Sequence, residues 1–338
     1  MKSFYKVLLT ILGLVALFLL FLILKPDLLI KEFISPITNN DEKAVVPEKP
    51  LLKYSYENLK KRSYPASQIE VGGLIKEAEN YTSRVFSFFT DGKKVTGQIN
   101  FPATSISNKM PVVIMLRGYV NKDGYKTGDG SRHASEVFSS HGYLTLAPDF
   151  LGYGGSDVAD TDSLKSRFET YVTAANLISS VGSLPQADTD HVFVWGHSNG
   201  GQVALSALEI TGKSFPTALW APVSKPFPFS VLFYSDEASD SGKFLRGIIS
   251  GFDKDYDANE YSLTSYLSWV DAPILIQQGL ADDIVLPRWS RELYKNLKDL
   301  GKNVKYLEYA GGNHNFSGSA WDQAVTGDVA FFSSFLGR

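Results

Sequence analysis

The sequence contains no cysteine, and its positive and negative charges nearly cancel. Its 338 residues include 33 lysines and arginines against 36 aspartates and glutamates, which gives a net charge of −3. Without cysteine, the chain cannot have a disulfide scaffold, a thiolate nucleophile or cysteine-ligated zinc or iron–sulfur sites. Without an excess of basic residues, nucleic acid is not expected as a partner.

The sequence also lacks the short motifs of metal and nucleotide sites. No H-E-x-x-H pattern occurs, and no other spacing typical of metal ligands is present. Thr211-Gly212-Lys213-Ser214 resembles the end of a phosphate-binding loop, but Ala207 stands where the first glycine of that loop is required. We therefore expect no cofactor and no metal.

One long stretch near the start is wholly apolar. Val7 to Leu24 is eighteen residues without a charge, and as a helix it would be about 27 Å long, nearly the thickness of the hydrocarbon core of a bilayer. Lys2 and Lys6 precede it, which fits both a signal peptide and an anchor with a cytoplasmic N-terminus. Because no A-x-A-like cleavage site follows, we expect residues 1–30 to form an uncleaved signal anchor, with the rest of the chain extracytoplasmic.

Residues 31–80 are expected to be a stalk and a lead-in to the folded domain. Ser35 to Pro50 is polar and rich in proline, which is typical of a linker. Lys53 to Arg62 is charged and is expected to be a short helix or irregular. A single domain is expected to begin near Tyr81 and to run to residue 338.

The first strands of this domain should form a hairpin. Two β-prone runs, Arg84 to Thr90 and Lys94 to Phe101, flank Asp91-Gly92, which is a strong signal for a tight turn between antiparallel strands. We expect this N-terminal hairpin to supply the antiparallel edge of a larger sheet.

After the hairpin, apolar strands alternate with amphipathic helices, which predicts an α/β fold with a mainly parallel sheet and helices on both faces. The expected strands are Val112 to Leu116, Leu144 to Ala147, Val192 to Trp195, Thr217 to Trp220, Ile274 to Gln277 and Val304 to Tyr309. The expected helices are Ser131 to Ser140, Ser163 to Val181, Gln202 to Ile210, Arg288 to Leu300 and Ala320 to Leu336.

One interval breaks this alternation. Residues 221–271 separate two consecutive strands and are too long for an ordinary connection. Segments of this kind usually act as lids, so we expect a helical lid insertion here. Its many aromatic residues each fit simple packing within a small subdomain, but as a group they suggest an apolar wall of a substrate pocket.

The strand Val192 to Trp195 leads into a candidate nucleophile. Gly196-His197-Ser198-Asn199-Gly200 fits the pattern G-x-S-x-G, and the helix Gln202 to Ile210 follows directly. Strand, tight turn and helix are the context that this pattern requires, because the serine sits in a strained turn that side chains at the flanking glycines would crowd. Ser198 is therefore the candidate nucleophile.

A serine needs a base, and the base needs a carboxylate to orient it. Of the five histidines, only His314 lies in a glycine-rich loop after the last expected strand, at the edge of the sheet where active sites form. Asp282 and Asp283 both follow the strand Ile274 to Gln277, and either of them fits the acid. For the other four histidines we expect surface or packing roles: His133, His141, His191 and His197.

Stabilisation of the oxyanion needs two donors. One is the backbone N–H of Asn199, which follows the nucleophile. The other should come from the loop after the strand Val112 to Leu116, where Gly118 lets the backbone approach the substrate. We assign it to Tyr119.

These segments together resemble the α/β-hydrolase fold and, within it, the catalytic domain of the prolyl oligopeptidase (S9) family and related esterases. The resemblance covers Tyr81 to Arg338. It rests on Arg117-Gly118-Tyr119, the turn Pro148 to Ser156 (P-D-F-L-G-Y-G-G-S), the elbow Gly196 to Gly201, the segment Gly279 to Val285 (G-L-A-D-D-I-V) and His314.

The resemblance refines the site and also marks departures from the family. The family's G-x-x-D-x-x-V spacing implies Asp282 rather than Asp283 as the acid. Arg117 replaces the family's usual histidine and Leu151 its usual arginine, so the support of the oxyanion loop should differ. The residues before Tyr81 are too few for the family's propeller, so peptidase activity is implied without its usual size filter.

We therefore expect a membrane-anchored serine hydrolase of S9 peptidase type, in which Ser198, Asp282 and His314 cleave acyl bonds of small peptides or esters through an acyl-enzyme. A carboxylesterase acting on small acyl esters is the alternative. A non-catalytic binding protein on a hydrolase scaffold is a third reading, because a fold does not fix a function. The expected partners are a small peptide or ester substrate and, through residues 1–30, the membrane; the oligomeric state is not predicted.

Overall fold

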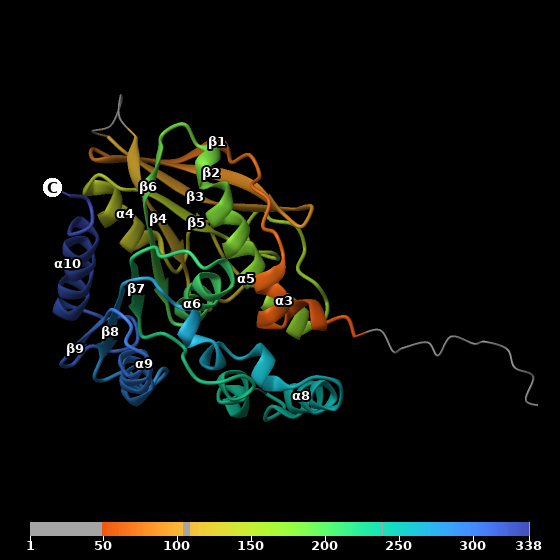
Figure 1. The fold of residues 1–338 in the computed structure, drawn as a ribbon. Coiled ribbons are helices and arrows are strands. Elements are labelled where there is room, and N and C mark those ends of the chain that lie inside the picture. Colours follow the sequence, from red (N-terminus) through yellow and green to blue (C-terminus); the bar gives the residue numbers. More distant parts are fainter. Residues whose placement is uncertain (1–48, 104–108, 238, 338) are drawn as a thin grey trace, which may run out of the picture. The chain divides into compact units, whose positions relative to one another are not determined.

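The computed structural model describes residues 49–103, 109–237 and 239–337 (Figure 1). The described residues belong to one compact unit that begins at Lys49. The expected anchor, Val7 to Leu24, and the expected stalk up to residue 48 lie outside the described residues. Within the described ranges, no helix is both long enough and apolar enough to cross a membrane.

Nine strands form one sheet in the described part of the chain, in the order β1-β2-β3-β5-β4-β6-β7-β8-β9. Their bounds are β1 (Glu70–Glu77), β2 (Tyr81–Thr90), β3 (Lys93–Pro102), β4 (Met110–Leu116), β5 (Leu144–Pro148), β6 (Ala187–His197), β7 (Thr217–Trp220), β8 (Ile274–Gly279) and β9 (Val304–Tyr309). The pairs β1–β2, β2–β3 and β3–β5 are antiparallel. The pairs from β5 to β9 are parallel, so the sheet is mainly parallel.

The helices connect these strands and cover both faces of the sheet. The α-helices are α3 (Tyr56–Lys61), α4 (Arg132–Ser140), α5 (Ser163–Ser180), α6 (Asn199–Thr211), α7 (Phe229–Leu232), α8 (Lys243–Asp255), α9 (Pro287–Asp299) and α10 (Ser319–Ser333). The 3-10 helices are η1 (Leu52–Tyr54), η2 (Val181–Ser183), η3 (Ser235–Glu237), η4 (Ala258–Tyr261), η5 (Leu263–Ser265) and η6 (Leu267–Trp269). Figure 1 shows α4 and α10 on one face and α3, α5 and α6 on the other.

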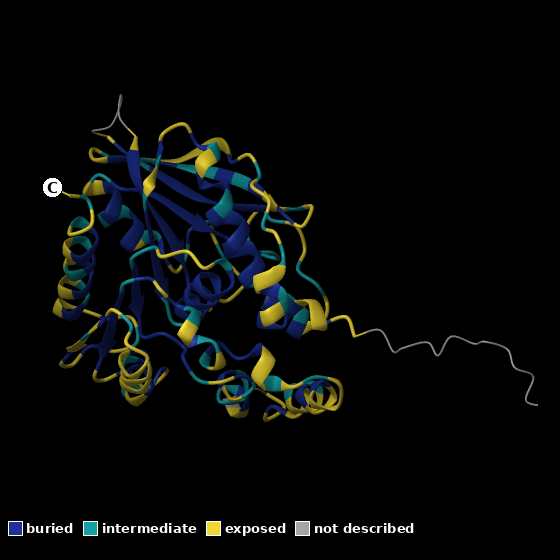
Figure 2. Cartoon of the chain, in the orientation of Figure 1, coloured by how far each residue is buried: buried dark blue, intermediate teal, exposed yellow. Residues whose placement is uncertain are grey.

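Strand β6 shows why the central strands are apolar throughout. Successive side chains of a strand point to opposite faces of the sheet. Val192 and Val194 join the buried cluster beneath α5 and α6, whereas Phe193 and Trp195 join the cluster beneath α4 and α10. Both faces are therefore covered, and Figure 2 shows the middle of the sheet in the buried colour.

The antiparallel edge is larger than the sequence predicts. Strands β2 and β3 pair from Tyr81↔Pro102 to Thr90↔Lys93 around a turn at Asp91 and Gly92, whose φ values are 48° and 78°. Positive φ at both positions is the geometry that favours the sequence Asp-Gly. Strand β1 pairs with β2 at the very edge, and the sequence does not reveal it because all of its residues are exposed and no apolar alternation marks it.

The compact unit also begins earlier than Tyr81, the start expected from the sequence. Tyr54, Tyr56 and Leu59 are buried, at 2%, 0% and 0% exposure, so the expected lead-in belongs to the core. The Tyr56 hydroxyl lies 2.6 Å from Ser206 Oγ on α6, and the Tyr56 ring stacks on Tyr266 at 4.9 Å. The sequence gives no sign of this burial, because Tyr56 contacts Ser206 and Tyr266, which are distant in the chain.

The lead-in also contacts the insertion between β7 and β8. The backbone N–H of Leu51 donates to the Tyr256 hydroxyl at 3.1 Å, and the Tyr261 hydroxyl donates to the Leu51 carbonyl at 3.2 Å. Lys49 Nζ donates to the carbonyl of Asp255, at the end of α8, at 2.8 Å. The C-terminal half of the insertion is therefore bonded to the start of the compact unit.

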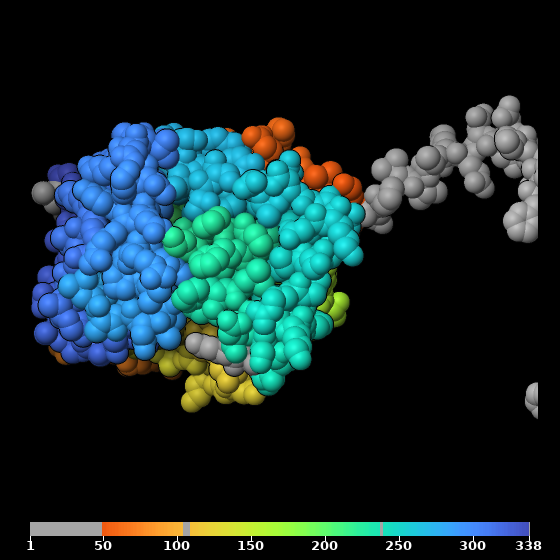
Figure 3. Space-filling model, turned by 90° about the horizontal axis from the view of Figure 1, so that it is seen from below, coloured from red at the N-terminus to blue at the C-terminus, as the bar shows by residue number. Residues whose placement is uncertain are grey.

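The insertion itself contains α7, α8 and four short 3-10 helices, and it forms a continuous part of the surface beside the C-terminal elements (Figure 3). Most of its aromatic residues pack within the core: the Phe227 and Phe252 rings lie 5.2 Å apart, and the Phe252 and Tyr261 rings 4.9 Å apart. A pocket that Ser198 lines also receives residues of the described part of the insertion: Val223, Ser230, Val231 and a single aromatic one, Tyr234. Packing within a small subdomain, the first of the two expected roles, therefore describes most of these rings, and the expected aromatic wall is reduced to Tyr234.

Two loops meet at the carboxyl edge of the sheet. Strands β5 and β6 lie on opposite sides of β4. The chain passes from β4 to β5 on one side and then crosses back to β6 on the other side. Sites in parallel α/β sheets form at such a reversal of strand order. The pairing of Leu116 with Gly196 at the end of β4 and β6 brings residues 117–119 beside residues 197–199.

Candidate active site

Ser198 lies in a strained turn between β6 and α6. Its φ and ψ are 56° and −122°, a conformation that costs energy for any residue with a side chain. The turn is held by the Ser198 N–H, which donates to the Trp220 carbonyl at 2.9 Å. A Cβ at Gly196 would lie 2.7 Å from the Gly200 carbonyl oxygen, and a Cβ at Gly200 would collide with the Leu116 carbonyl, so both glycines are required by close packing.

The structure brings His314 and Asp282 together. His314 Nδ1 lies 2.9 Å from Asp282 Oδ2, although the two residues come from different loops, after β9 and β8. The Asp282 carboxylate is held by three further donors: the N–H groups of Ile284 and Val285, each at 2.9 Å, and Gln278 Nε2 at 3.0 Å. The neighbouring Asp283 is exposed.

The environment of Asp282 determines which nitrogen of His314 carries a proton. Burial tends to raise the pKa of Asp282, but the hydrogen bonds from His314, Val285 and Gln278 outweigh burial and lower it. An ionised carboxylate only accepts hydrogen bonds, so His314 Nδ1 must carry the proton. In the neutral ring, the lone pair is then on Nε2, the nitrogen that a general base uses.

His197 holds the backbone of the His314 loop, a role that the sequence does not suggest. His197 Nε2 lies 2.9 Å from the His314 carbonyl oxygen, and the two rings are 4.8 Å apart. Burial and the neighbouring His314 lower the pKa of His197 to about 4, so a neutral ring donates this hydrogen bond. The contact places His314 beside the residue that precedes Ser198.

Arg117 holds the loop expected to supply the second oxyanion donor. Its Nη1 donates to the Gly118 carbonyl at 3.0 Å and its Nη2 to the Asp149 carbonyl at 2.7 Å. In a trans peptide the carbonyl and the next N–H point in opposite directions. The bond to the Gly118 carbonyl thus fixes the opposite direction of the Tyr119 N–H.

The Arg117 guanidinium is enclosed by aromatic rings. The ring centres of Tyr125, Phe150 and Tyr153 lie 5.0, 5.5 and 4.2 Å from it, within the range of cation–π attraction. Phe150 and Tyr153 belong to the turn in which Leu151 stands where the family has arginine. The chain thus has an arginine in this region, but it comes from position 117.

Gly118 packs directly against the nucleophile. A Cβ at this position would lie 2.9 Å from Ser198 Cβ and 3.2 Å from the His197 carbonyl oxygen. Only glycine leaves room for the backbone at this distance from the serine. The loop that carries Tyr119 therefore packs against Ser198, and the other expected donor, the N–H of Asn199, stands at the start of α6.

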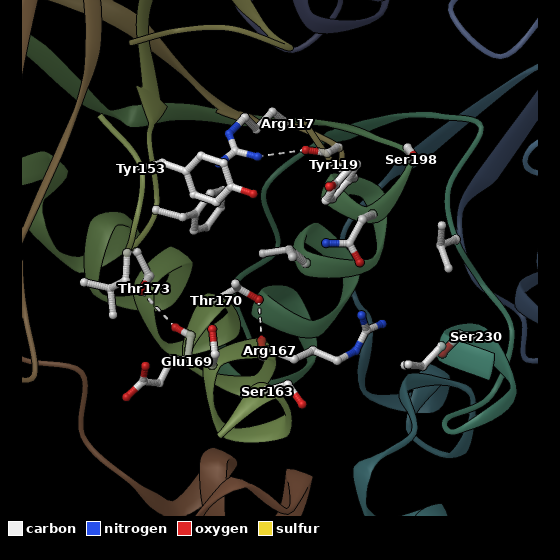
Figure 4. Close-up of a pocket in the computed structure, with 18 of the residues that line it drawn as sticks. Arg117, Tyr119, Tyr153, Ser163, Arg167, Glu169, Thr170, Thr173, Ser198 and Ser230 are labelled. Atoms are coloured by element: carbon white, nitrogen blue, oxygen red, sulfur yellow. Dashed lines mark hydrogen bonds between the residues drawn. The ribbon is translucent and has the colours of Figure 1, made fainter. Parts of the chain in front are cut away.

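Ser198, Asn199 and Tyr119 line a pocket of about 750 Å³ (Figure 4). This is the size of a typical small-molecule site. Apart from the oxyanion loop and the start of α6, its walls come from the turn after β5, from α5 and from the insertion. Residues of these walls include Phe150, Leu151, Tyr153, Arg167, Glu169, Val203, Val223, Val231 and Tyr234.

The remaining histidines lie elsewhere. His133 stacks on Trp321 at 4.1 Å, His141 Nδ1 bonds to the Val137 carbonyl at the end of α4, and His191 Nδ1 lies 2.7 Å from Asp188 Oδ2. Among the residues that the structure describes, no three histidine, aspartate or glutamate side chains are grouped as ligands for a metal ion.

Comparison with known sequences gives a family match. The model of the prolyl oligopeptidase family matches residues 130–338, which is more than half of the chain and contains Ser198, Asp282 and His314. The chain is also 26% identical over 182 residues to the uncharacterized peptidase YtmA of Bacillus subtilis (strain 168). That alignment covers 53% of this chain and 67% of the relative.

Comparison with solved structures shows the α/β-hydrolase fold. Acetyl xylan esterase 1 from Thermoanaerobacterium sp. JW/SL YS485 superposes with a TM-score of 0.62 at 16% identity, over 82% of this chain and 92% of that one. A puromycin-hydrolyzing peptidase of Mycobacterium tuberculosis gives a TM-score of 0.61 at 20% identity, over 77% of this chain and 40% of that one. At these identities the likeness concerns the fold alone.

Proposed function

Because the chain belongs to the prolyl oligopeptidase family of serine hydrolases, we propose that Ser198, His314 and Asp282 form its catalytic triad and cleave acyl bonds of small peptides or esters. The observation that carries the proposal is the bond of 2.9 Å between His314 and Asp282. It leaves Nε2 of His314 free to act as the base in the neutral ring, and the His314 loop is bonded to His197, the residue before Ser198.

In the proposed reaction, the Ser198 oxygen attacks the carbonyl carbon of the substrate while His314 Nε2 takes the hydroxyl proton. The negative charge that forms on the carbonyl oxygen accepts hydrogen bonds from the N–H groups of Asn199 and Tyr119. When the intermediate collapses, His314 returns the proton to the leaving amine or alcohol. Water then hydrolyses the acyl-enzyme by the same route, and Asp282 orients His314 throughout.

The substrate itself is proposed at the level of a class. Peptidases and esterases share this chemistry, and the pocket lining combines residues 117–119, the turn after β5, α5, the start of α6, the insertion and Ile284. A carboxylesterase acting on small acyl esters is therefore the second candidate. Parallel measurement of aminoacyl amides and short acyl esters of the same acyl group separates the two.

We also propose that Val7 to Leu24 anchors the protein in the cytoplasmic membrane with the catalytic domain outside. The support is the uncharged run itself, preceded by Lys2 and Lys6. In a cell with the tagged full chain, the protein should stay in the membrane fraction after an alkaline wash. In intact spheroplasts, external protease should remove the C-terminal tag. Release of the protein by the wash would contradict the anchor, and protection of the tag from the protease would contradict its orientation.

The triad is tested by a fluorophosphonate probe, which reacts with activated serines. Wild-type full-length protein in mild detergent should be labelled, and Ser198→Ala, His314→Ala and Asp282→Asn should not be labelled at a comparable rate. Matched controls are Ser163→Ala, which lines the same pocket, and Asp283→Asn; both should react as wild type does. Folded wild-type protein that resists the probe would favour a binding protein on a hydrolase scaffold.

A further inference from the structure

The wall of the pocket on α5 carries two charged residues, Arg167 and Glu169. Figure 4 shows that their side chains leave the helix in opposite directions: Glu169 away from Ser198, and Arg167 towards the space between Ser198 and Ser230. The charge that faces the serine across the pocket is therefore that of the guanidinium.

The other charges that line the pocket already have partners. Glu169 is paired with Lys93, whose Nζ lies 3.2 Å from Oε1. Arg117 is buried and bonds to the carbonyls of Gly118 and Asp149. Neither group is available to a ligand without breaking these contacts.

Arg167 differs because it retains unused donors. Its Nη2 donates to Gln202 Oε1 at 2.6 Å, and the guanidinium also interacts with the Tyr171 hydroxyl. A guanidinium has five N–H groups, and the Nε–H of Arg167 is buried without any partner. Among the residues in the described ranges, none supplies a carboxylate that forms an ion pair with Arg167.

A partly buried guanidinium without a counter-ion is costly, because it has lost water without gaining a compensating charge. A carboxylate supplies the missing negative charge, and its two oxygens match the paired N–H groups of the guanidinium better than any neutral acceptor. Apolar residues that line the same pocket, such as Val203 and Val231, reduce screening by water and strengthen such a pair.

We propose that Arg167 binds a carboxylate of the substrate, so that the preferred substrates are esters or amides with an anionic group on the part that fills the pocket. This inference rests on the proposed function of Ser198. An enzyme that binds the positively charged amino terminus of a peptide needs a negative charge in its pocket. The available charge in this pocket is positive, so it favours a negative group on the substrate.

The inference is tested with pairs of esters that differ only in charge. For the acyl side, the pair is p-nitrophenyl hydrogen glutarate and p-nitrophenyl valerate; for the leaving group, it is 4-acetoxybenzoate and 4-methylphenyl acetate. The full-length wild type should show a higher kcat/KM for the anionic member of at least one pair. In Arg167→Gln that preference should fall by about ten- to a hundredfold, as expected for the loss of a hydrogen bond to a charged group.

Three further variants separate binding from structure. Arg167→Lys should retain part of the preference, and Arg167→Glu should reverse it. Arg84→Gln removes an equivalent guanidinium from the edge of the sheet, where it bonds only to the Gly72 carbonyl, and should leave the preference unchanged. In Arg167→Gln the rate on the anionic ester should fall by a larger factor than the rate on its neutral counterpart, whereas a purely structural role for the Arg167–Gln202 bond would lower both rates by the same factor.

The failure of this inference can be told from the failure of the proposed function. If the fluorophosphonate labels Ser198 but Arg167→Gln leaves the preference unchanged in both pairs, the inference is overturned and the hydrolase stands. If no ester is hydrolysed, the binding of intact p-nitrophenyl hydrogen glutarate is measured by calorimetry with Ser198→Ala and with Ser198→Ala/Arg167→Gln. Weaker binding by the double variant supports the role of Arg167. Equal binding by the two variants, or no binding by either, refutes it.

Discussion

Replacement of Arg117 by methionine should damage catalysis more than it changes substrate binding. The variant keeps a long apolar side chain among the rings of Tyr125 and Tyr153 but removes both hydrogen bonds, to the carbonyls of Gly118 and Asp149. Each bond has a charged donor and contributes about 1.5–3 kcal/mol. The cation–π contacts with the two rings add about 0.5–2 kcal/mol.

The loss of these contacts should lower both the free energy of unfolding and kcat. With the Gly118 carbonyl unbound, the peptide that carries the Tyr119 N–H is free to rotate, and the oxyanion loses one positioned donor. Complete loss of such a donor lowers kcat by about 10²- to 10³-fold, so partial misplacement should lower it by about tenfold or more. KM should change little, because the donor acts mainly on the transition state.

The assay is steady-state hydrolysis of p-nitrophenyl acetate, together with the second-order rate of fluorophosphonate labelling and a thermal unfolding curve. Arg117→Lys keeps the charge but cannot bond to two carbonyls in the same fork, so it should fall between wild type and Arg117→Met. If Arg117→Met is folded and its kcat equals that of wild type, Arg117 does not position the oxyanion loop. A change confined to the unfolding temperature would leave Arg117 with a structural role only.

Three other substitutions test separate parts of the structure. Gly118→Ala should abolish labelling of Ser198, because the new Cβ would lie 2.9 Å from Ser198 Cβ; labelling at the wild-type rate would show that the two loops are not in contact. His197→Phe should lower kcat by about tenfold by releasing the His314 carbonyl, and His197→Gln, which keeps a donor, should recover part of the rate. Since the pKa of His197 is about 4, neither variant should move the pH–rate profile between pH 6 and 9, and a shift there would contradict a neutral His197. Glu209→Met should stabilise the fold at neutral pH by about 1–3 kcal/mol, because both carboxyl oxygens of Glu209 are buried without a partner. Burial raises the pKa of Glu209 well above its usual value, so the wild type loses stability as pH rises above the unfolded-state pKa of about 4.3; unfolding curves from pH 4 to 8 should show that loss in wild type and not in Glu209→Met.

The central sheet could be predicted because its signal is local. Buried strands such as Val192 to Trp195 are continuous apolar runs, since helices cover both faces, and the pattern G-x-S-x-G marks the following turn. The sequence also left only two carboxylates for the partner of His314, and the structure distinguishes them by burial: Asp282 is buried at 4% exposure, whereas Asp283 is exposed.

The remainder depends on contacts between distant residues. Strand β1 is fully exposed, so it has neither the alternation nor the apolar run that predicts a strand. The bond from His197 to the His314 carbonyl spans 117 positions of the chain, and nothing near His197 in the sequence reveals it. For the aromatic residues of the insertion the sequence left two roles open, because composition alone does not distinguish a ring that lines the pocket, such as Tyr234, from rings that pack together.

The contacts between the lead-in and the insertion limit how the pocket can open. Leu51 and Lys49 bond to Tyr256, Tyr261 and Asp255, and these residues form the C-terminal half of the insertion. A lid that swung away as one body would have to break all three bonds and uncover the buried side chains behind them. On the insertion side, a wider pocket would therefore require movement of the N-terminal half, which contributes Val231 and Tyr234 to the lining and is itself held by the bond from the Tyr234 hydroxyl to the Ile284 carbonyl.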